Sequence, residues 1–157
     1  MEQFYISTLN YIRQHPILNK TITLITKYSP YIPFILYPIL LIYLFIIKHP
    51  LLLPTFIKPS IAFISLSIFR KIINRKRPYE IYNYKPLLEH KSGQSFPSRH
   101  TLSAFIIALV CLDISLTLGI IMLVLAIIIA LSRIIAGIHH ISDVVVAIVF
   151  AFIVYII

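Results

Sequence analysis

Long apolar runs separated by short polar segments dominate this sequence. A helix that crosses the hydrocarbon core of a bilayer needs about 20 mainly apolar residues, with a lower limit of about 17. The pattern predicts about five such helices, the first of them near the lower limit. We place them at Tyr31–Ile47, Leu51–Ile73, His100–Leu112, Leu116–Leu131 and Asp143–Ile157. We therefore expect an all-α, polytopic membrane helical bundle that forms a single domain over residues 1–157.

Two segments stand outside these runs. Residues 1–29 mix apolar positions with charged and polar ones, which is typical of a helix lying at the membrane interface. Residues 74–99 form one long polar loop, and loops of this length in compact proteins are usually functional or disordered. The sequence therefore predicts an N-terminal interfacial helix and a functional 74–99 loop.

Counting the spans assigns the polar segments to two sides of the membrane. Because successive spans alternate in direction, the 74–99 loop and the segment Ser132–Ser142 lie on the same side as the N-terminus. Lys48 to Pro50 and the turn at Asp113 lie on the other side. This arrangement predicts one site that is built from the loop and the later polar segment.

Composition narrows the class of protein. Hydrophobic residues make up 59% of the 157 residues and charged residues 12%, whereas about a quarter of residues are charged in soluble domains. The formal net charge of +9 favours contact with phosphate groups or anionic lipid headgroups. Nucleic acid is excluded as a partner, because the basic residues flank apolar spans and form no soluble basic face. The single cysteine, Cys111, excludes an intramolecular disulfide.

Three polar clusters converge on the predicted site. Their sequences are RKIINRKRP at 70–78, FPSRHT at 96–101 and SRIIAGIHHISD at 132–143. His139 and Asp143 are four residues apart, so in a helical segment an Asp oxygen can reach the imidazole. Arg70 and Arg77 are seven apart and share a helical face if the second span continues that far.

These residue types fit phosphoryl transfer. Arginine binds phosphate oxygens in a multidentate way, and a helix that starts near Pro97-Ser98 offers free backbone N–H groups to an anion. Two histidines from different segments can divide the work of nucleophile and proton donor, and an aspartate can hold the nucleophilic imidazole in one tautomer. No cluster contains a set of carboxylates suited to Mg²⁺. We therefore expect metal-free chemistry through a phosphohistidine, with no cofactor.

The three clusters resemble the signature motifs of the type 2 phosphatidic acid phosphatase superfamily, which run K-x6-R-P, P-S-G-H and S-R-x5-H-x3-D. The third motif is matched at Ser132, Arg133, His139 and Asp143. The second is matched at Pro97, Ser98 and His100, with Arg99 at the glycine position. The first is matched at Arg77 and Pro78, with Arg70 at the lysine position. The resemblance covers roughly residues 60–157 and includes the order and separation of the motifs.

The resemblance implies a haloperoxidase-like phosphatase core and a role for each matched residue. His139 would be the nucleophile, Asp143 would orient it, and His100 would be the general acid and then the base that activates water. The residues implied in phosphate binding are Arg70, Arg77, Ser98, Arg99 and Arg133. A charged residue at the position of Arg99 is common in bacterial isoprenoid-diphosphate phosphatases of the superfamily, and points toward a diphosphate substrate.

Other polar residues have simpler interpretations. We interpret His140 as a neighbour that lines the site, and His15, His49 and His90 as interfacial residues. Lys71, Arg75 and Lys76 are interpreted as anchors for lipid headgroups. The loop tyrosines could either cover the site or lie at the interface, and the sequence does not decide between these positions; they are Tyr79, Tyr82 and Tyr84.

Together these observations predict a multi-pass lipid phosphatase of a bacterial cell membrane. The expected substrate is undecaprenyl diphosphate, with phosphatidylglycerophosphate or phosphatidate as alternatives; a non-catalytic lipid-binding or transport protein is the alternative of another class. The Ile, Lys, Tyr and Asn usage indicates an AT-rich bacterial genome. The excess of basic residues would place the site in the cytoplasm, whereas the resemblance favours the extracytoplasmic face, which we adopt as the expectation.

Overall fold

The computed structural model describes residues 1–90 and 92–157, and every regular element in these ranges is a helix. Lys91, in the predicted 74–99 loop, lies outside the described residues. The elements are α1 (Glu2–Gln14), α2 (Pro16–Tyr28), α3 (Tyr31–Ile46), α4 (Leu52–Ile73), α5 (Pro78–Ile81), α6 (Arg99–Ile114), α7 (Leu116–Ile135) and α8 (Ile141–Ile156). The all-α prediction is confirmed for these residues.

Helix boundaries follow local backbone chemistry. Pro16 opens α2 after an extended His15, because a proline at the first helical position gives up only an N–H that has no helical partner. Asn74 adopts a left-handed conformation (φ 41°) and ends α4, as residues with a short polar side chain can. Ser115 separates α6 from α7, and its hydroxyl accepts a hydrogen bond from the N–H of Leu118 at 3.4 Å.

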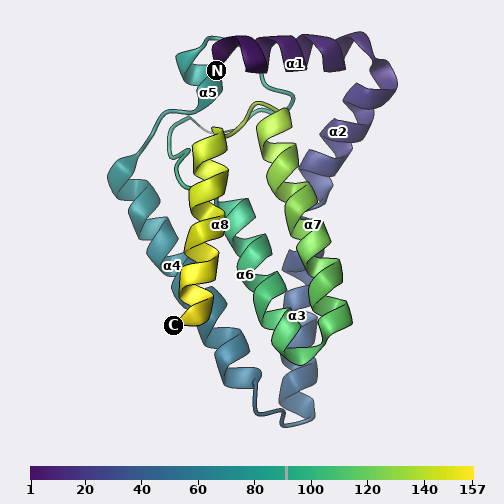
Figure 1. The fold of residues 1–157 in the computed structure, drawn as a ribbon, viewed down its shortest axis with the longest axis vertical. Coiled ribbons are helices and arrows are strands. Elements are labelled where there is room, and N and C mark those ends of the chain that lie inside the picture. Colours follow the sequence, from purple (N-terminus) through teal and green to yellow (C-terminus); the bar gives the residue numbers. More distant parts are fainter. Residues whose placement is uncertain (91) are drawn as a thin grey trace.

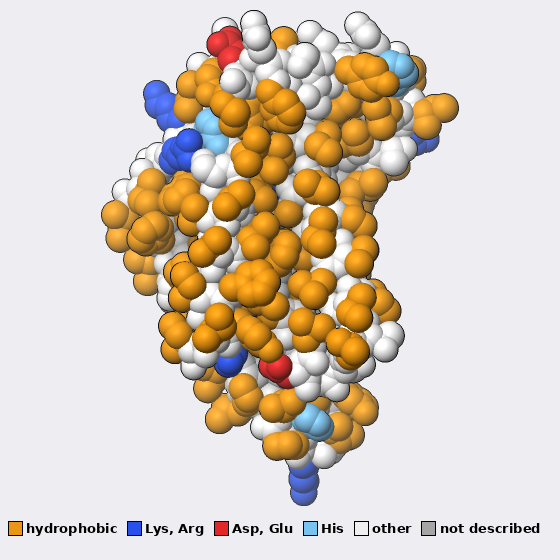
Figure 2. Space-filling model, in the orientation of Figure 1, with side chains coloured by type: hydrophobic (Ala, Val, Ile, Leu, Met, Phe, Trp, Pro, Cys, Tyr) orange, Lys and Arg blue, Asp and Glu red, His pale blue; other side chains and the backbone are white. Residues whose placement is uncertain are grey.

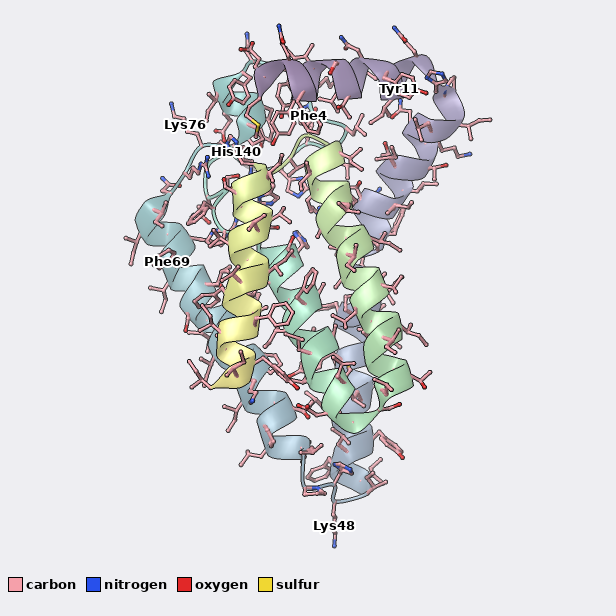
Figure 3. The ribbon with its side chains drawn as sticks, viewed as in Figure 1. Phe4, Tyr11, Lys48, Phe69, Lys76 and His140 are labelled. Carbon is pink, nitrogen blue, oxygen red and sulfur yellow. The ribbon has the colours of Figure 1, made fainter. Side chains whose placement is uncertain are left out.

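The helices form an elongated bundle, with α1 lying across one end of it (Figure 1). α6 occupies the centre and packs against α4, α7 and α8. Its residues from Ala104 to Cys111 are all buried, which explains why this span is apolar on every side. The loop between α3 and α4 lies at the opposite end of the bundle, where Lys48 projects outward (Figure 3).

A broad apolar surface separates the two ends of the molecule (Figure 2). Within residues 1–90 and 92–157, three helical stretches are long and apolar enough to cross a membrane: Pro16–Ile46, Leu52–Ile81 and Leu116–Ile135. α6 and α8, with 16 residues each, are shorter. The predicted count of five spans therefore stays a prediction, although α6, α7 and α8 run alongside one another in the bundle (Figure 1).

The first apolar stretch begins earlier than the sequence pattern predicted. It runs for 31 residues from Pro16, not from Tyr31, because α2 leads into α3 after a short turn at Ser29 and Pro30. At 1.5 Å per residue it measures about 46 Å, more than the roughly 30 Å of hydrocarbon. A tilt, a kink at Ser29 and Pro30, or an extension into the headgroup region must therefore accommodate the excess length. The predicted interfacial position of residues 1–29 is compatible with that length and stays a prediction.

Candidate active site

The turn between α7 and α8 carries His139. α7 continues through Ser132 and Arg133, so these residues lie in its last turn, and the chain reverses only at Gly137 (φ +71°). The N–H groups of Ile138 and His139 donate to the carbonyl of Arg133 at 3.1 and 3.3 Å. Because a left-handed residue suits glycine, Gly137 allows the helix to end and the imidazole to turn inward. The His139 side chain is 2% exposed.

His139 faces a buried carboxylate. Its Nδ1 lies 3.4 Å from Oδ2 of Asp143, in the first turn of α8. The Ser95 hydroxyl lies 3.4 Å from the same Nδ1 and donates to Asp143 Oδ2. With Nδ1–H directed at the carboxylate, the lone pair lies on Nε2, which is the tautomer that a nucleophilic imidazole requires.

Burial controls the ionisation of His139. Its pKa is lowered to about 4: desolvation by burial is the main cause and the charges of Arg77 and Arg70 act in the same direction, whereas Asp143 opposes the shift. The imidazole is therefore neutral at pH 7. It becomes charged only when it forms a bond to an electrophile, and Asp143 is placed to stabilise that charge.

Asp143 is held by groups from three parts of the chain. Besides Ser95, the N–H of His140 donates to its Oδ2 at 3.0 Å and Arg75 Nη1 donates to its Oδ1 at 2.9 Å. The side chain is fully buried. Its backbone carbonyl accepts from the N–H of Ser98 at 2.9 Å, which ties the second polar cluster to the third. The predicted convergence of the loop with the later segment is thus confirmed.

Three buried guanidinium groups belong to the same region. Arg70 donates to the carbonyl of Pro97, Arg77 donates to the carbonyls of Gly93 and Ile138 at 3.3 Å each, and Arg133 donates to the carbonyl of Thr26 at 2.7 Å. Desolvation lowers the pKa of Arg77. Within the described part of the chain, the Nε atoms of Arg70 and Arg133 are buried without a hydrogen-bond partner. Because a buried donor of a cationic group is costly without an acceptor, these two guanidinium groups fit an anion such as phosphate.

The start of α6 supplies the second histidine. Ser98 precedes the helix, and its Oγ accepts a hydrogen bond from Thr101 at 2.9 Å. His100 is exposed, and its ring centroid lies 6.4 Å from that of His90. The Arg99 guanidinium lies over the Phe63 ring at 5.7 Å, a cation–π contact, and its predicted phosphate contact stays a prediction.

A row of cavities leads away from His100. The first, about 430 Å³, is lined by Lys27, His90, His100 and Arg133 among others. The second, about 320 Å³, shares Pro30, Phe34 and His100 with the first. The third, about 360 Å³, shares Phe34, Phe63 and Ser103 with the second and is almost wholly apolar. His139 is not among the lining residues of these three cavities.

Sequence reasoning missed three contributors to the site. Ser95 was not selected because it precedes the recognised cluster and a lone serine carries no signal. Arg75 was interpreted as a headgroup anchor, whereas it forms an ion pair with Asp143 at 2.9 Å. His90 was interpreted as interfacial, whereas it lines the cavity beside His100. His140 agrees with its prediction as a neighbour: it is buried against Tyr82, with ring centroids 6.4 Å apart.

The fold and the site define a helical membrane protein with a buried His–Asp pair beside a cluster of buried arginines. The model of the PAP2 superfamily matches residues 51–157, and the chain belongs to this superfamily. Among solved structures, LpxE of Aquifex aeolicus is 29% identical, with a TM-score of 0.74 over 90% of this chain and 85% of that one.

A second solved structure is similar in fold. It is described as the first transmembrane PAP2-type phosphatidylglycerolphosphate phosphatase, from Bacillus subtilis, with 18% identity and a TM-score of 0.56 over 96% of this chain and 90% of that one. No curated protein matches the chain. The family match, together with the similarity to LpxE, identifies the chain as a membrane lipid phosphatase of the PAP2 type, and the Bacillus structure shares its fold.

Proposed function

We propose that the protein hydrolyses a lipid diphosphate, with undecaprenyl diphosphate as the first candidate, through a phosphohistidine at His139. The observation that carries this proposal is the buried His139–Asp143 pair next to two arginines whose Nε atoms are buried and unpartnered. A phosphate group that is bound there would supply both the missing acceptor oxygens and the missing negative charge.

The reaction takes place in two displacements. The Nε2 lone pair of His139 attacks the terminal phosphorus, and the bond from phosphorus to the leaving oxygen breaks as His100 donates its proton to that oxygen. Asp143 stabilises the positive imidazole, while Arg70, Arg77 and Arg133 bind the equatorial oxygens. His100 then takes a proton from water, whose oxygen attacks phosphorus and releases inorganic phosphate and neutral His139.

The cavities support a lipid diphosphate as substrate. The cavity of about 430 Å³ borders His100, where the leaving group must lie; Lys27 gives it a basic group that suits a second phosphate, His90 gives it a hydrogen-bonding imidazole, and Glu89 is its one acidic lining residue in the described part of the chain. The apolar cavity at Phe34, Tyr37 and Phe63 continues toward the middle of the bundle and suits a hydrocarbon chain. A lipid could enter this row of cavities from the bilayer.

The position of Arg99 favours a second candidate. The guanidinium of Arg99, the residue that pointed to a diphosphate, is engaged in a cation–π contact with Phe63 in this arrangement. A monoester such as phosphatidylglycerophosphate or phosphatidate is therefore the alternative. A non-catalytic lipid-binding or transport role would predict loss of a catalytic residue, yet His100, His139 and Asp143 are all present.

We further propose that no metal ion takes part and that the protein is a bacterial cell-membrane enzyme with its site on the extracytoplasmic face. Among the described residues, no group of three or more His, Cys, Asp or Glu side chains is arranged to hold a metal. The phosphate charge is instead met by arginine, which is the usual alternative to a cation.

Phosphate release from purified protein in detergent tests this function. The panel contains undecaprenyl diphosphate, phosphatidylglycerophosphate and phosphatidate, each measured with EDTA and with Mg²⁺. We expect release in EDTA, fastest from the diphosphate, and none from His139→Ala. His49→Ala, at the other end of the bundle, is the matched control. Release that requires Mg²⁺, or that persists in His139→Ala, would contradict the mechanism.

A further inference from the structure

Helix α1 lies outside the residues matched by the family model, yet it covers the turn that carries the nucleophile. It crosses the end of the bundle above α7 and α8 (Figures 1 and 3). Its inner face buries Tyr5, Leu9 and Ile12, which are 1%, 1% and 2% exposed. The Arg13 side chain donates to the carbonyl of Lys85 and ties the far end of α1 to the 74–99 loop. α1 is therefore packed as part of the site.

Tyr5 contacts the nucleophile's own peptide unit. Its hydroxyl donates a hydrogen bond to the carbonyl of His139 at 3.2 Å. Its ring stacks on Tyr84 at 5.7 Å (22° between planes) and on Tyr82 at 6.3 Å (26°). Burial raises the pKa of Tyr5 to about 12, so the phenol remains a donor throughout the working pH range.

Tyr84 holds the same turn from the loop side. Its hydroxyl donates to the carbonyl of Gly137 at 3.0 Å. A Cβ added at Gly137 would lie 2.8 Å from Tyr84 Cε2 and 3.1 Å from Leu9 Cδ1, so both elements close tightly on the turn. Of the three loop tyrosines whose position the sequence left open, Tyr82 and Tyr84 thus cover the site.

These two hydrogen bonds engage the carbonyls of the Gly137–Ile138 and His139–His140 peptide units, which lie on either side of the Ile138–His139 unit. Peptide planes in a turn rotate easily unless their carbonyls are engaged, and the direction of an imidazole depends on the backbone that carries it. A displacement of about 1 Å of a reacting group can cost about 100-fold in rate. Loss of either hydroxyl would therefore change how often His139 faces phosphorus, without changing the arginines that bind phosphate.

We propose that α1 is a positioning element for the reaction, in which Tyr5, together with Tyr84, clamps the 137–139 turn and aims the His139 imidazole. This inference rests on the proposed role of His139 as nucleophile. It assigns no contact with substrate to either tyrosine.

The test compares Tyr5→Phe and Tyr84→Phe with the matched control Tyr11→Phe, an exposed tyrosine on the same helix. Each change removes one hydroxyl and keeps the ring, so the stacked cluster is preserved. We expect kcat on the best lipid of the panel to fall about tenfold in the first two variants, with KM within about twofold and wild-type values in the control. Amide hydrogen exchange, followed by mass spectrometry, should rise in the 136–140 peptide and stay unchanged in α6.

Each result decides a separate claim. Wild-type kcat in Tyr5→Phe, or a fall in kcat that is matched by a rise in KM, would overturn the positioning role. Unchanged exchange at 136–140 would overturn the clamp. If the wild type released no phosphate from any lipid, the proposed function would fail, while faster exchange at 136–140 in Tyr5→Phe would still support the clamp.

Discussion

Nδ1 of His139 lies 3.4 Å from Oδ2 of Asp143, and the Ser95 hydroxyl contacts both groups. The carboxylate is itself held by the His140 N–H and by Arg75. The imidazole is therefore fixed in orientation by a carboxylate that other groups keep in place. This relationship determines how the site responds to substitution and to pH.

Asp143→Asn should reduce kcat by at least about 100-fold with little change in KM. An amide can present its NH₂ to Nδ1 and favour the wrong tautomer, and it no longer stabilises the charged imidazole. Steady-state kinetics on the best lipid of the panel measure the effect. Asp113→Asn, which alters a carboxylate bonded to Tyr155 at the other end of the molecule, should remain within about twofold of wild type. Equal effects of the two substitutions would refute a specific role for Asp143.

Stability should fall as the pH drops from about 6.5 toward 4. The pKa of His139 is lowered to about 4 in the folded protein, so the unfolded chain binds more protons within this window. The contribution of neutral His139 is complete above pH 6.5 and is lost as acid protonates the unfolded state. His90 and His140, whose pKa values are also lowered, add slopes of the same sign.

The change His139→Gln isolates one part of that slope. Thermal unfolding in detergent between pH 4 and 7.5 should show a shallower decline for the variant than for the wild type, because glutamine does not titrate. Parallel curves would show that His139 is not held neutral by its surroundings.

Arg133→Lys should lower kcat/KM by about 100-fold. The guanidinium is 2% exposed and its buried Nε is available to a phosphate oxygen, whereas an ammonium group offers a point charge and cannot bind with two parallel N–H groups. Lys48→Arg, at the exposed opposite end, is the control for a basic exchange. Wild-type kcat/KM in Arg133→Lys would remove this residue from the phosphate site.

Thiol labelling of two cysteine variants determines on which side of the membrane the active site lies. In a Cys111→Ala background, Lys76→Cys at the site end should react with an impermeant thiol reagent in intact cells, and Lys48→Cys should react only after lysis (Figure 3 shows the two positions). The reverse pattern would place the active site in the cytoplasm, as the distribution of basic residues alone suggests.

The sequence was sufficient for the parts of this structure that depend on periodicity and spacing. Apolar runs predicted the helices, and the alternation of spans predicted that the loop meets the 132–143 segment, which the Ser98–Asp143 contact confirms. The helix expected from Tyr31 is α3, but the continuation of the apolar helical stretch back to Pro16 was not expected, since Asn19, Lys20 and Lys27 interrupt the apolar pattern of α2.

Contacts between residues that are distant in the chain could not be predicted from the sequence. Tyr5 and His139 are 134 residues apart, and no local pattern relates them. RKIINRKRP contains four basic residues besides Arg75, so its sequence does not show which of the five pairs with Asp143. The ion pair of Arg75 with Asp143 depends on how α4 ends at Asn74. The contact of Arg99 with Phe63 likewise depends on the packing of α4 against α6.

The most direct test of the account is to trap the phosphorylated enzyme. Purified protein is mixed with lipid labelled at its terminal phosphate and quenched in alkali within milliseconds, and the labelled peptide is mapped. We predict an alkali-stable, acid-labile label on the peptide that contains His139, and no label in His139→Ala. Turnover of the labelled lipid by the wild type with no label on this peptide, or a label on His100 or His140 instead, would contradict the assignment of His139 as the nucleophile.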